Sequence, residues 1–145
     1  MRRVESELTI GASPDAVFAF VAELDNLPTW QAGVLSAEQT TSGPTGVGTT
    51  ARVLRELMGQ RMAVDVTVTA FDQGRRLAFE GAAAGLSVAA AMDLAPAGDG
   101  TLVRASTEIR ARSPFMAALE GMAAGIAQEE LATGLQRLKA AIEAT

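Results

Sequence analysis

The chain has 145 residues, of which 48% are hydrophobic and 20% are charged, and its formal net charge is −5. This length and composition fit one globular domain with a substantial core, and the negative charge argues against a nucleic-acid partner. Cysteine, histidine and tyrosine are absent, which excludes disulfides, thiolate or imidazole metal ligands and the commonest general base. We therefore expect no catalytic residue, no metal and no cofactor.

The N-terminal residues Met1–Glu7 are charged and lack the apolar run of a signal peptide. No segment approaches the roughly 20 apolar residues that a membrane-spanning helix needs. No linker, internal repeat or low-complexity tail divides the chain. We expect residues 1–145 to form a single domain of a cytoplasmic protein, with no stable membrane insertion.

The first elements are expected to be a strand and a helix. Residues 4–10 alternate in polarity, which predicts a strand with one buried face. A helix then begins at Ser13, which can cap it, with Pro14 suited to its first turn. Residues 25–28 interrupt this helix, and a short second helical turn is expected to carry Trp30.

Residues 34–112 alternate between apolar and polar side chains in short runs, which predicts strand after strand. After a loop at residues 42–48, the strands are expected at 49–58, 62–69, 75–81, 86–94 and 103–110, with turns at 59–60, 72–74 and 96–100. Charged residues gather on one face of each strand, so the sheet is antiparallel with one wet and one buried face. The expected fold is α+β, with about seven strands in the order strand, two short helices, six strands and one long helix.

The long C-terminal helix is expected to run from Ser113-Pro114, a second capping signal, to about residue 144. It carries two apolar stripes on nearly opposite sides. The first stripe comprises Phe115, Leu119, Met122 and Ile126, and the second comprises Leu131, Leu135, Leu138 and Ile142. A straight helix cannot turn both stripes to one sheet. Either it bends or breaks near residues 121–125, or the first stripe meets a ligand, a gating loop or a second subunit.

The acidic residues of the strands are expected on the solvent face. Asp65, Asp93 and Glu108 each alternate with apolar neighbours, which places their side chains opposite the buried face. Glu129 and Glu130 lie between the two stripes of the long helix, where either one could point inward. These positions leave few acidic groups for a buried site.

Arg55 is the basic residue of most interest. If Ala51, Val53 and Leu57 face inward, Arg55 does too, and it could bind a ligand carboxylate or phenolate. In the other register, or with a bulge in the strand at 49–58, Arg55 lies on the surface. The sequence leaves both arrangements open.

Two segments near the N-terminus resemble a known family. Residues 12–22, ASPDAVFAFVA, and residues 25–30, DNLPTW, resemble the opening of the polyketide cyclase/dehydrase-like proteins of the START and birch-pollen-allergen (SRPBCC) superfamily. Residues 46–49, 75–77 and 100–103 are similar to its later strand openings. The resemblance covers essentially the whole chain. It implies a helix-grip fold, in which a curved antiparallel sheet wraps around the long C-terminal helix and encloses a cavity.

The resemblance also implies a hydrophobic ligand such as a lipid, a polyketide, a sterol or an aromatic compound. Small residues at the expected inward positions Gly81, Ala90 and Ala105 support a cavity, because they leave space unfilled. The candidate ligand-binding residues are Trp30, Arg55, Met62, Val64, Val66, Phe79, Val88, Ala90, Met92, Phe115, Leu119, Met122 and Ile126. Each apolar member has a plain alternative as core, and Trp30 could instead anchor the second helix.

Three functions are compatible with these features. The leading hypothesis is binding, transport or sensing of a small hydrophobic ligand in an internal apolar cavity, without catalysis. The second is a polyketide cyclase, aromatase or dehydratase, as in a minority of the family, with Arg55, Glu129 and Glu130 as its only plausible titratable groups. The third is an interaction domain that uses the first stripe of the long helix to pair with a partner or to form a homodimer.

Overall fold

The computed structural model describes residues 1–57, 59–83 and 85–144. The elements follow the predicted order: β1 (Arg2–Ile10), α1 (Pro14–Ala22), the 3-10 turn η1 (Leu24–Asn26), α2 (Leu27–Trp30), β2 (Val34–Gln39), β3 (Thr50–Leu57), β4 (Gln60–Asp72), β5 (Arg76–Ala83), β6 (Leu86–Ala97), β7 (Gly100–Ala111), the 3-10 turn η2 (Pro114–Met116) and α3 (Ala117–Glu143). The predicted end of the third strand, Met58, lies outside the described residues.

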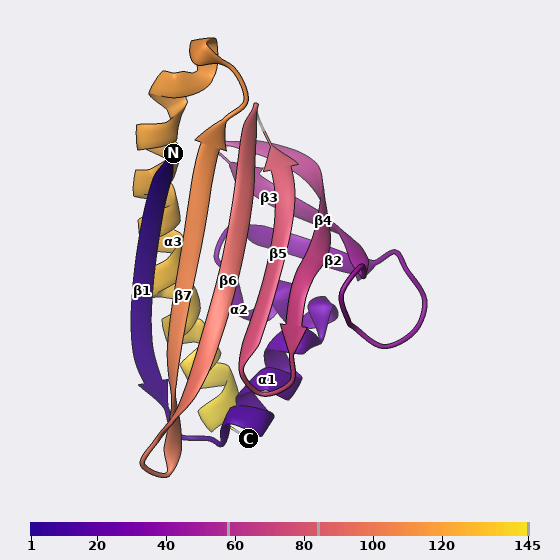
Figure 1. Ribbon diagram of the computed structural model, residues 1–145, viewed down its shortest axis with the longest axis vertical. Coiled ribbons are helices and arrows are strands. Elements are labelled where there is room, and N and C mark those ends of the chain that lie inside the picture. The colour runs from indigo at the N-terminus through magenta and orange to yellow at the C-terminus, as the bar shows by residue number, and fades with distance from the viewer. Residues whose placement is uncertain (58, 84, 145) are drawn as a thin grey trace.

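The described strands form one antiparallel sheet in the order β1-β7-β6-β5-β4-β3-β2. The first strand therefore pairs with the last, and the other strands follow as consecutive hairpins. Figure 1 shows the sheet curving around α3, which lies along β1 and β7, while α1 lies near the C-terminus against β6 and β7 and α2 contacts α3 and β2. This arrangement confirms the predicted α+β class and the helix-grip fold.

The two Ser-Pro sequences start their helices differently. The backbone N–H of Ala16 donates a hydrogen bond to the Ser13 hydroxyl at 3.2 Å, so the predicted cap of α1 is confirmed. Ser113 makes no such bond, because Pro114–Met116 closes as a 3-10 turn and α3 begins only at Ala117. The predicted cap at Ser113 is wrong.

The long helix α3 runs without a break from Ala117 to Glu143, so a break near residues 121–125, one of the alternatives that the sequence left open, does not occur. In the second apolar stripe Leu135, Leu138 and Ile142 are buried, and Leu131 is partly buried. The first stripe divides instead of facing one partner: Phe115 is 97% exposed, Met122 is 57% exposed, and Leu119 packs beside Leu86 and Ile109. The N-terminal half of α3 turns the small residues Ala123 and Ala124 to the sheet.

Polar contacts tie the C-terminal end of α3 to the first strand. The ammonium group of Lys139 donates to the carbonyl of Thr9 at 2.9 Å and to the Glu143 carboxylate at 2.7 Å. The backbone N–H of Gly11 also donates to Glu143, at 2.8 Å. The hydrogen bond from Lys139, followed by that from Gly11, lowers the pKa of the Glu143 carboxyl.

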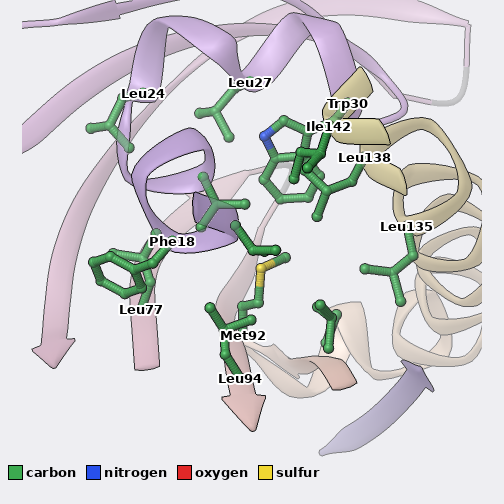
Figure 2. Packing of buried hydrophobic residues seen from close by; sticks show 14 of the residues in the cluster. Phe18, Leu24, Leu27, Trp30, Leu77, Met92, Leu94, Leu135, Leu138 and Ile142 are labelled. Atoms are coloured by element: carbon green, nitrogen blue, oxygen red, sulfur yellow. The ribbon is translucent and has the colours of Figure 1, made fainter. Parts of the chain in front are cut away.

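The core has two parts. The larger part lies under α1 and α2 and contains the bulky side chains of Phe18, Leu24, Leu27, Leu135, Leu138 and Ile142 (Figure 2). There the ring of Phe18 meets Phe71 edge-on, with 5.1 Å between their centres. The smaller part joins Leu86 and Ile109 to Ala123 and Ala124 of α3. The space between the two parts is the cavity described next.

Candidate ligand cavity

A cavity of about 140 Å³ lies between α3 and the inner face of the sheet. Its wall takes residues from α2, from β3 to β7 and from α3, so every layer of the fold contributes. The lining residues are Leu27, Trp30, Gln31, Ala32, Val53, Arg55, Leu57, Val64, Val66, Phe79, Gly81, Ala82, Ala83, Leu86, Val88, Ala90, Ala105, Thr107, Ile109, Ala123, Ile126, Ala127, Glu130, Leu131, Gly134 and Leu135. The wall is therefore mostly apolar.

Small side chains on both sides explain why this space stays open. Ala90 and Ala105 on the sheet, together with Ala123 and Ala127 on α3, line the cavity. Gly81 adds no side chain, and a Cβ there would lie 3.1 Å from Val66 Cγ1 and 3.2 Å from the Asp65 carbonyl oxygen. Native packing normally leaves few voids larger than a water molecule. The cavity is thus a consequence of residue size on two facing surfaces.

Arg55 points toward this cavity. In β3 the inward positions alternate, and Ala51 and Val53 are almost fully buried. The pairing of Arg55 with Met62 continues the register that pairs Val53 with Val64. The irregularity at this edge falls in β2, between Val34 and Ser36, and not in β3. Of the two registers that the sequence left open, the inward one is confirmed.

The Arg55 guanidinium forms an ion pair with Glu130 of α3. Its Nη2 donates to Glu130 Oε1 at 2.7 Å, and the two side chains are 22% and 25% exposed. Gly33 of the α2–β2 turn lies against this pair with φ of 86°. The positive φ favours glycine here, and a Cβ at Gly33 would displace the Glu130 carboxylate and lie 2.9 Å from Arg55 Nη2. Glu130 is the inward member of the Glu129–Glu130 pair.

Two buried nitrogens of the cavity wall have no hydrogen-bond partner among the described residues. They are the indole Nε1 of Trp30 and the Nε of Arg55. Thr107 on β7 adds a buried hydroxyl to the wall. Figure 2 shows the Trp30 indole among Leu27, Leu138 and Ile142, so this side chain serves both as an anchor and as cavity wall.

Eight of the thirteen candidate ligand-binding residues line the cavity. They are Trp30, Arg55, Val64, Val66, Phe79, Val88, Ala90 and Ile126. The structure places the other five, Met62, Met92, Phe115, Leu119 and Met122, outside its wall. Met92 is buried in the larger core, and Phe115 faces solvent because η2 precedes the start of α3.

The candidate list omitted other residues of the wall. Ala105, Thr107 and Ile109 follow the alternation of β7, a signal present in the sequence. Ala123 and Ala127 on α3 had no such signal, because alanine is common on either side of a helix. These two alanines contribute to the cavity because their small side chains leave space unfilled.

The acidic residues of the strands pair with arginines on the outer face. Asp65 lies 3.1 Å from Arg52, Asp93 lies 2.8 Å from Arg76, and Glu108 lies 2.9 Å from Arg3. All six side chains are well exposed, which confirms the predicted solvent position of these carboxylates. Across residues 1–57, 59–83 and 85–144, no three His, Cys, Asp or Glu side chains gather as metal ligands would.

Comparisons with solved structures support the fold. The chain is similar to TTHA0849 from Thermus thermophilus, with a TM-score of 0.82 at 22% identity over 99% of this chain and 98% of that one. It is also similar to a START superfamily protein from Mycobacterium smegmatis, with a TM-score of 0.81 at 16% identity over 97% of both chains. A third similar structure is the Zhui aromatase/cyclase from Streptomyces sp. R1128, with a TM-score of 0.79 at 14% identity over 98% of this chain and 93% of that one.

These similarities show that the chain has a helix-grip fold. A family model described as "Polyketide cyclase / dehydrase and lipid transport" matches residues 1–143, and the chain belongs to this family. A search of curated proteins by sequence gave no match. None of the described helices is long and apolar enough to cross a membrane.

Proposed function

We propose that this protein binds one small, mainly apolar molecule in the cavity between α3 and the sheet, as a carrier or a sensor. The observation that carries the proposal is the cavity itself, an apolar space inside an otherwise closely packed domain. An empty space of this kind lowers stability, because its lining loses van der Waals contacts. An apolar cavity with a few polar groups is the usual form of a small-molecule site.

The volume of the cavity favours a compact ligand. At about 140 Å³ it is close to an engineered apolar cavity of about 150 Å³ in another protein that binds benzene. Drug-sized ligands occupy roughly 300–1,000 Å³. A molecule built on one ring fits the observed state, whereas a lipid or a polyketide needs α3 and the sheet to move apart.

A cyclase, aromatase or dehydratase reaction has less support. The described cavity wall contains two ionisable side chains, Arg55 and Glu130, and each is held by the other. Glu129, the other candidate acid, is exposed. Acid–base chemistry needs a group that is free to give or take a proton, so a binding protein fits this wall better than an enzyme.

Pairing with a second copy, a cytoplasmic location and the lack of a nucleic-acid partner remain predictions. Phe115 and Met122 are the exposed members of the first stripe, which was predicted to support pairing. Sedimentation of the wild type and of a Phe115→Ser, Met122→Ser double variant tests this. A mass that rises with concentration in the wild type alone supports a homodimer, and a monomer at every concentration contradicts it.

Calorimetric titration with ethylbenzene, a single-ring probe, tests the binding function. We expect saturable binding of one molecule per chain. Ala90→Phe fills the cavity and should weaken binding more than tenfold, whereas Ala89→Phe on the opposite face should not. Ala89 is a matched control because it is the next residue of β6 and lies between Glu80 and Glu108. No saturable binding, or equal binding by both variants, contradicts the proposal.

A further inference from the structure

Two buried N–H donors of the cavity wall have no hydrogen-bond partner among the described residues. A guanidinium has five N–H donors. Among the described residues, Arg55 donates one side-chain hydrogen bond, from Nη2 to Glu130 Oε1 at 2.7 Å. The Nε of Arg55 and the Nε1 of Trp30 are buried without a partner among the described residues. A buried donor without a partner loses its hydrogen bond to water, so such groups are rare unless something binds them.

Trp30 and Arg55 come from segments that meet at one corner of the cavity wall. The backbone N–H of Glu56 donates to the Gly33 carbonyl at 2.8 Å, which fixes the α2–β2 turn against β3. On the helix side, a Cβ at Gly134 would lie 3.2 Å from the Trp30 carbonyl oxygen. Gly134 is one helical turn beyond Glu130, the partner of Arg55. The two unpaired donors therefore come from segments that are packed together.

The charge of this corner is already balanced. Glu130 neutralises Arg55 at 2.7 Å, and the rest of the described cavity wall carries no ionisable side chain. A ligand carboxylate would bring a second negative charge close to Glu130, where the low dielectric strengthens repulsion. An uncharged oxygen that accepts a hydrogen bond meets no such repulsion.

We propose that the cavity selects an apolar molecule that carries an uncharged acceptor oxygen, such as a ketone, over the corresponding carboxylate. The inference rests on the proposed binding function and adds the ligand class. The N–H groups of Trp30 Nε1 and Arg55 Nε bind this oxygen. Both nitrogens are closed to solvent, so the ligand oxygen reaches them by widening this corner of the cavity.

Three probes of similar shape separate the head groups: acetophenone, ethylbenzene and benzoate, titrated calorimetrically at pH 7. A carbonyl buried without a donor would bind roughly ten- to a hundredfold more weakly than the ethyl analogue, because it loses its hydrogen bonds to water. We expect acetophenone to bind at least as tightly as ethylbenzene, and benzoate at least tenfold more weakly than acetophenone. If ethylbenzene binds but acetophenone binds tenfold more weakly, this inference fails and the binding function stands. If none of the three binds, the binding function itself fails.

The single tryptophan gives a direct signal from the corner. In a ¹H–¹⁵N spectrum its one indole N–H resonance should move further downfield with acetophenone than with ethylbenzene, whose ring makes the same ring-current contribution.

Trp30→Phe keeps the aromatic wall but removes the indole N–H. It should weaken the binding of acetophenone about two- to tenfold, the worth of one hydrogen bond, with little effect on the binding of ethylbenzene. Ser106→Ala removes a hydroxyl from the neighbouring position of β7, outside the cavity wall, and should leave the affinity for acetophenone unchanged. Loss of binding in Ser106→Ala instead of Trp30→Phe would overturn the assigned corner.

Glu130→Gln tests the charge argument. It removes the carboxylate beside Arg55, so benzoate should bind at least tenfold more tightly while acetophenone changes little. Glu129→Gln removes the same charge from the neighbouring exposed position and should change the affinity for neither benzoate nor acetophenone. Benzoate binding more tightly than acetophenone in the wild type would show that a carboxylate displaces Glu130, and would overturn the proposal.

Discussion

The two halves of α3 meet the same sheet with different results. In the C-terminal half, Leu135, Leu138 and Ile142 fill the space against α1 and α2. In the N-terminal half, Ala123 and Ala127 face Ala90 and Ala105 across a cavity. The backbone is regular in both halves, so side-chain volume decides which part of the domain is closed and which part has room for a ligand.

Leu138→Ala should produce the largest effect on stability. Leu138 is fully buried in the filled half, and its truncation should lower the free energy of unfolding by about 2–5 kcal/mol. Leu131→Ala, at the cavity wall, should cost less because that side chain already borders empty space. Urea denaturation compares the two variants. Equal losses would mean that both sites are packed alike.

Replacing an alanine by leucine at two positions should give the next largest effect on stability. Ala51 is fully buried away from the cavity, so Ala51→Leu should overpack the core and cost about 1–3 kcal/mol of stability. Ala90→Leu places its added atoms in the cavity and should stay within about 1 kcal/mol of the wild type. The same denaturation series decides this, and a larger loss in Ala90→Leu would mean that the cavity cannot take these atoms.

Removing the serine hydroxyl at the two Ser-Pro helix starts should give a smaller difference in stability. Ser13→Ala removes the hydrogen bond to the backbone of Ala16 and should cost about 1 kcal/mol. Ser113→Ala removes no cap bond and should change stability by less than about 0.5 kcal/mol. Thermal unfolding of both variants is sufficient. A comparable loss in Ser113→Ala would place a cap where the structure shows none.

The smallest effect should depend on pH. The pKa of Glu143 is lowered in the folded state by Lys139 and Gly11, so the ionised carboxylate stabilises the fold near neutral pH. This contribution is lost as the pH falls through the lowered pKa. The urea midpoints of the wild type and Glu143→Gln should therefore differ at pH 7 and converge at low pH. Glu129→Gln is the exposed control, and a difference that grows in acid would contradict this role.

Much of the fold could be predicted from the sequence because its signals are local. Alternation over residues 4–10 predicted β1, and Ser13-Pro14 predicted the start of α1. Helical periodicity is recognised mainly from large apolar residues. Phe115 and Met122 therefore suggested that this face of α3 packs against a partner, but both side chains are exposed in the structure. The face that α3 turns to the sheet in that half is made of alanines, which carry little signal.

The cavity was harder to predict residue by residue. Strand alternation placed Val64, Val66 and Ala90 correctly on its wall. The ion pair between Arg55 and Glu130 joins residues 75 positions apart, and its formation depends on how the sheet curves toward α3. The unpaired indole N–H of Trp30 is likewise a property of packing, which no local pattern contains.

The four isoleucines allow a direct test of the central claim, that the underfilled half of the domain is the binding site. Ile109 and Ile126 line the cavity, whereas Ile10 and Ile142 lie in the filled core. In a methyl NMR spectrum of isoleucine-labelled protein, saturating ethylbenzene should shift the resonances of Ile109 and Ile126 and leave those of Ile10 and Ile142 nearly unchanged. Shifts confined to Ile10 and Ile142, equal small shifts of all four, or none at all would contradict the account.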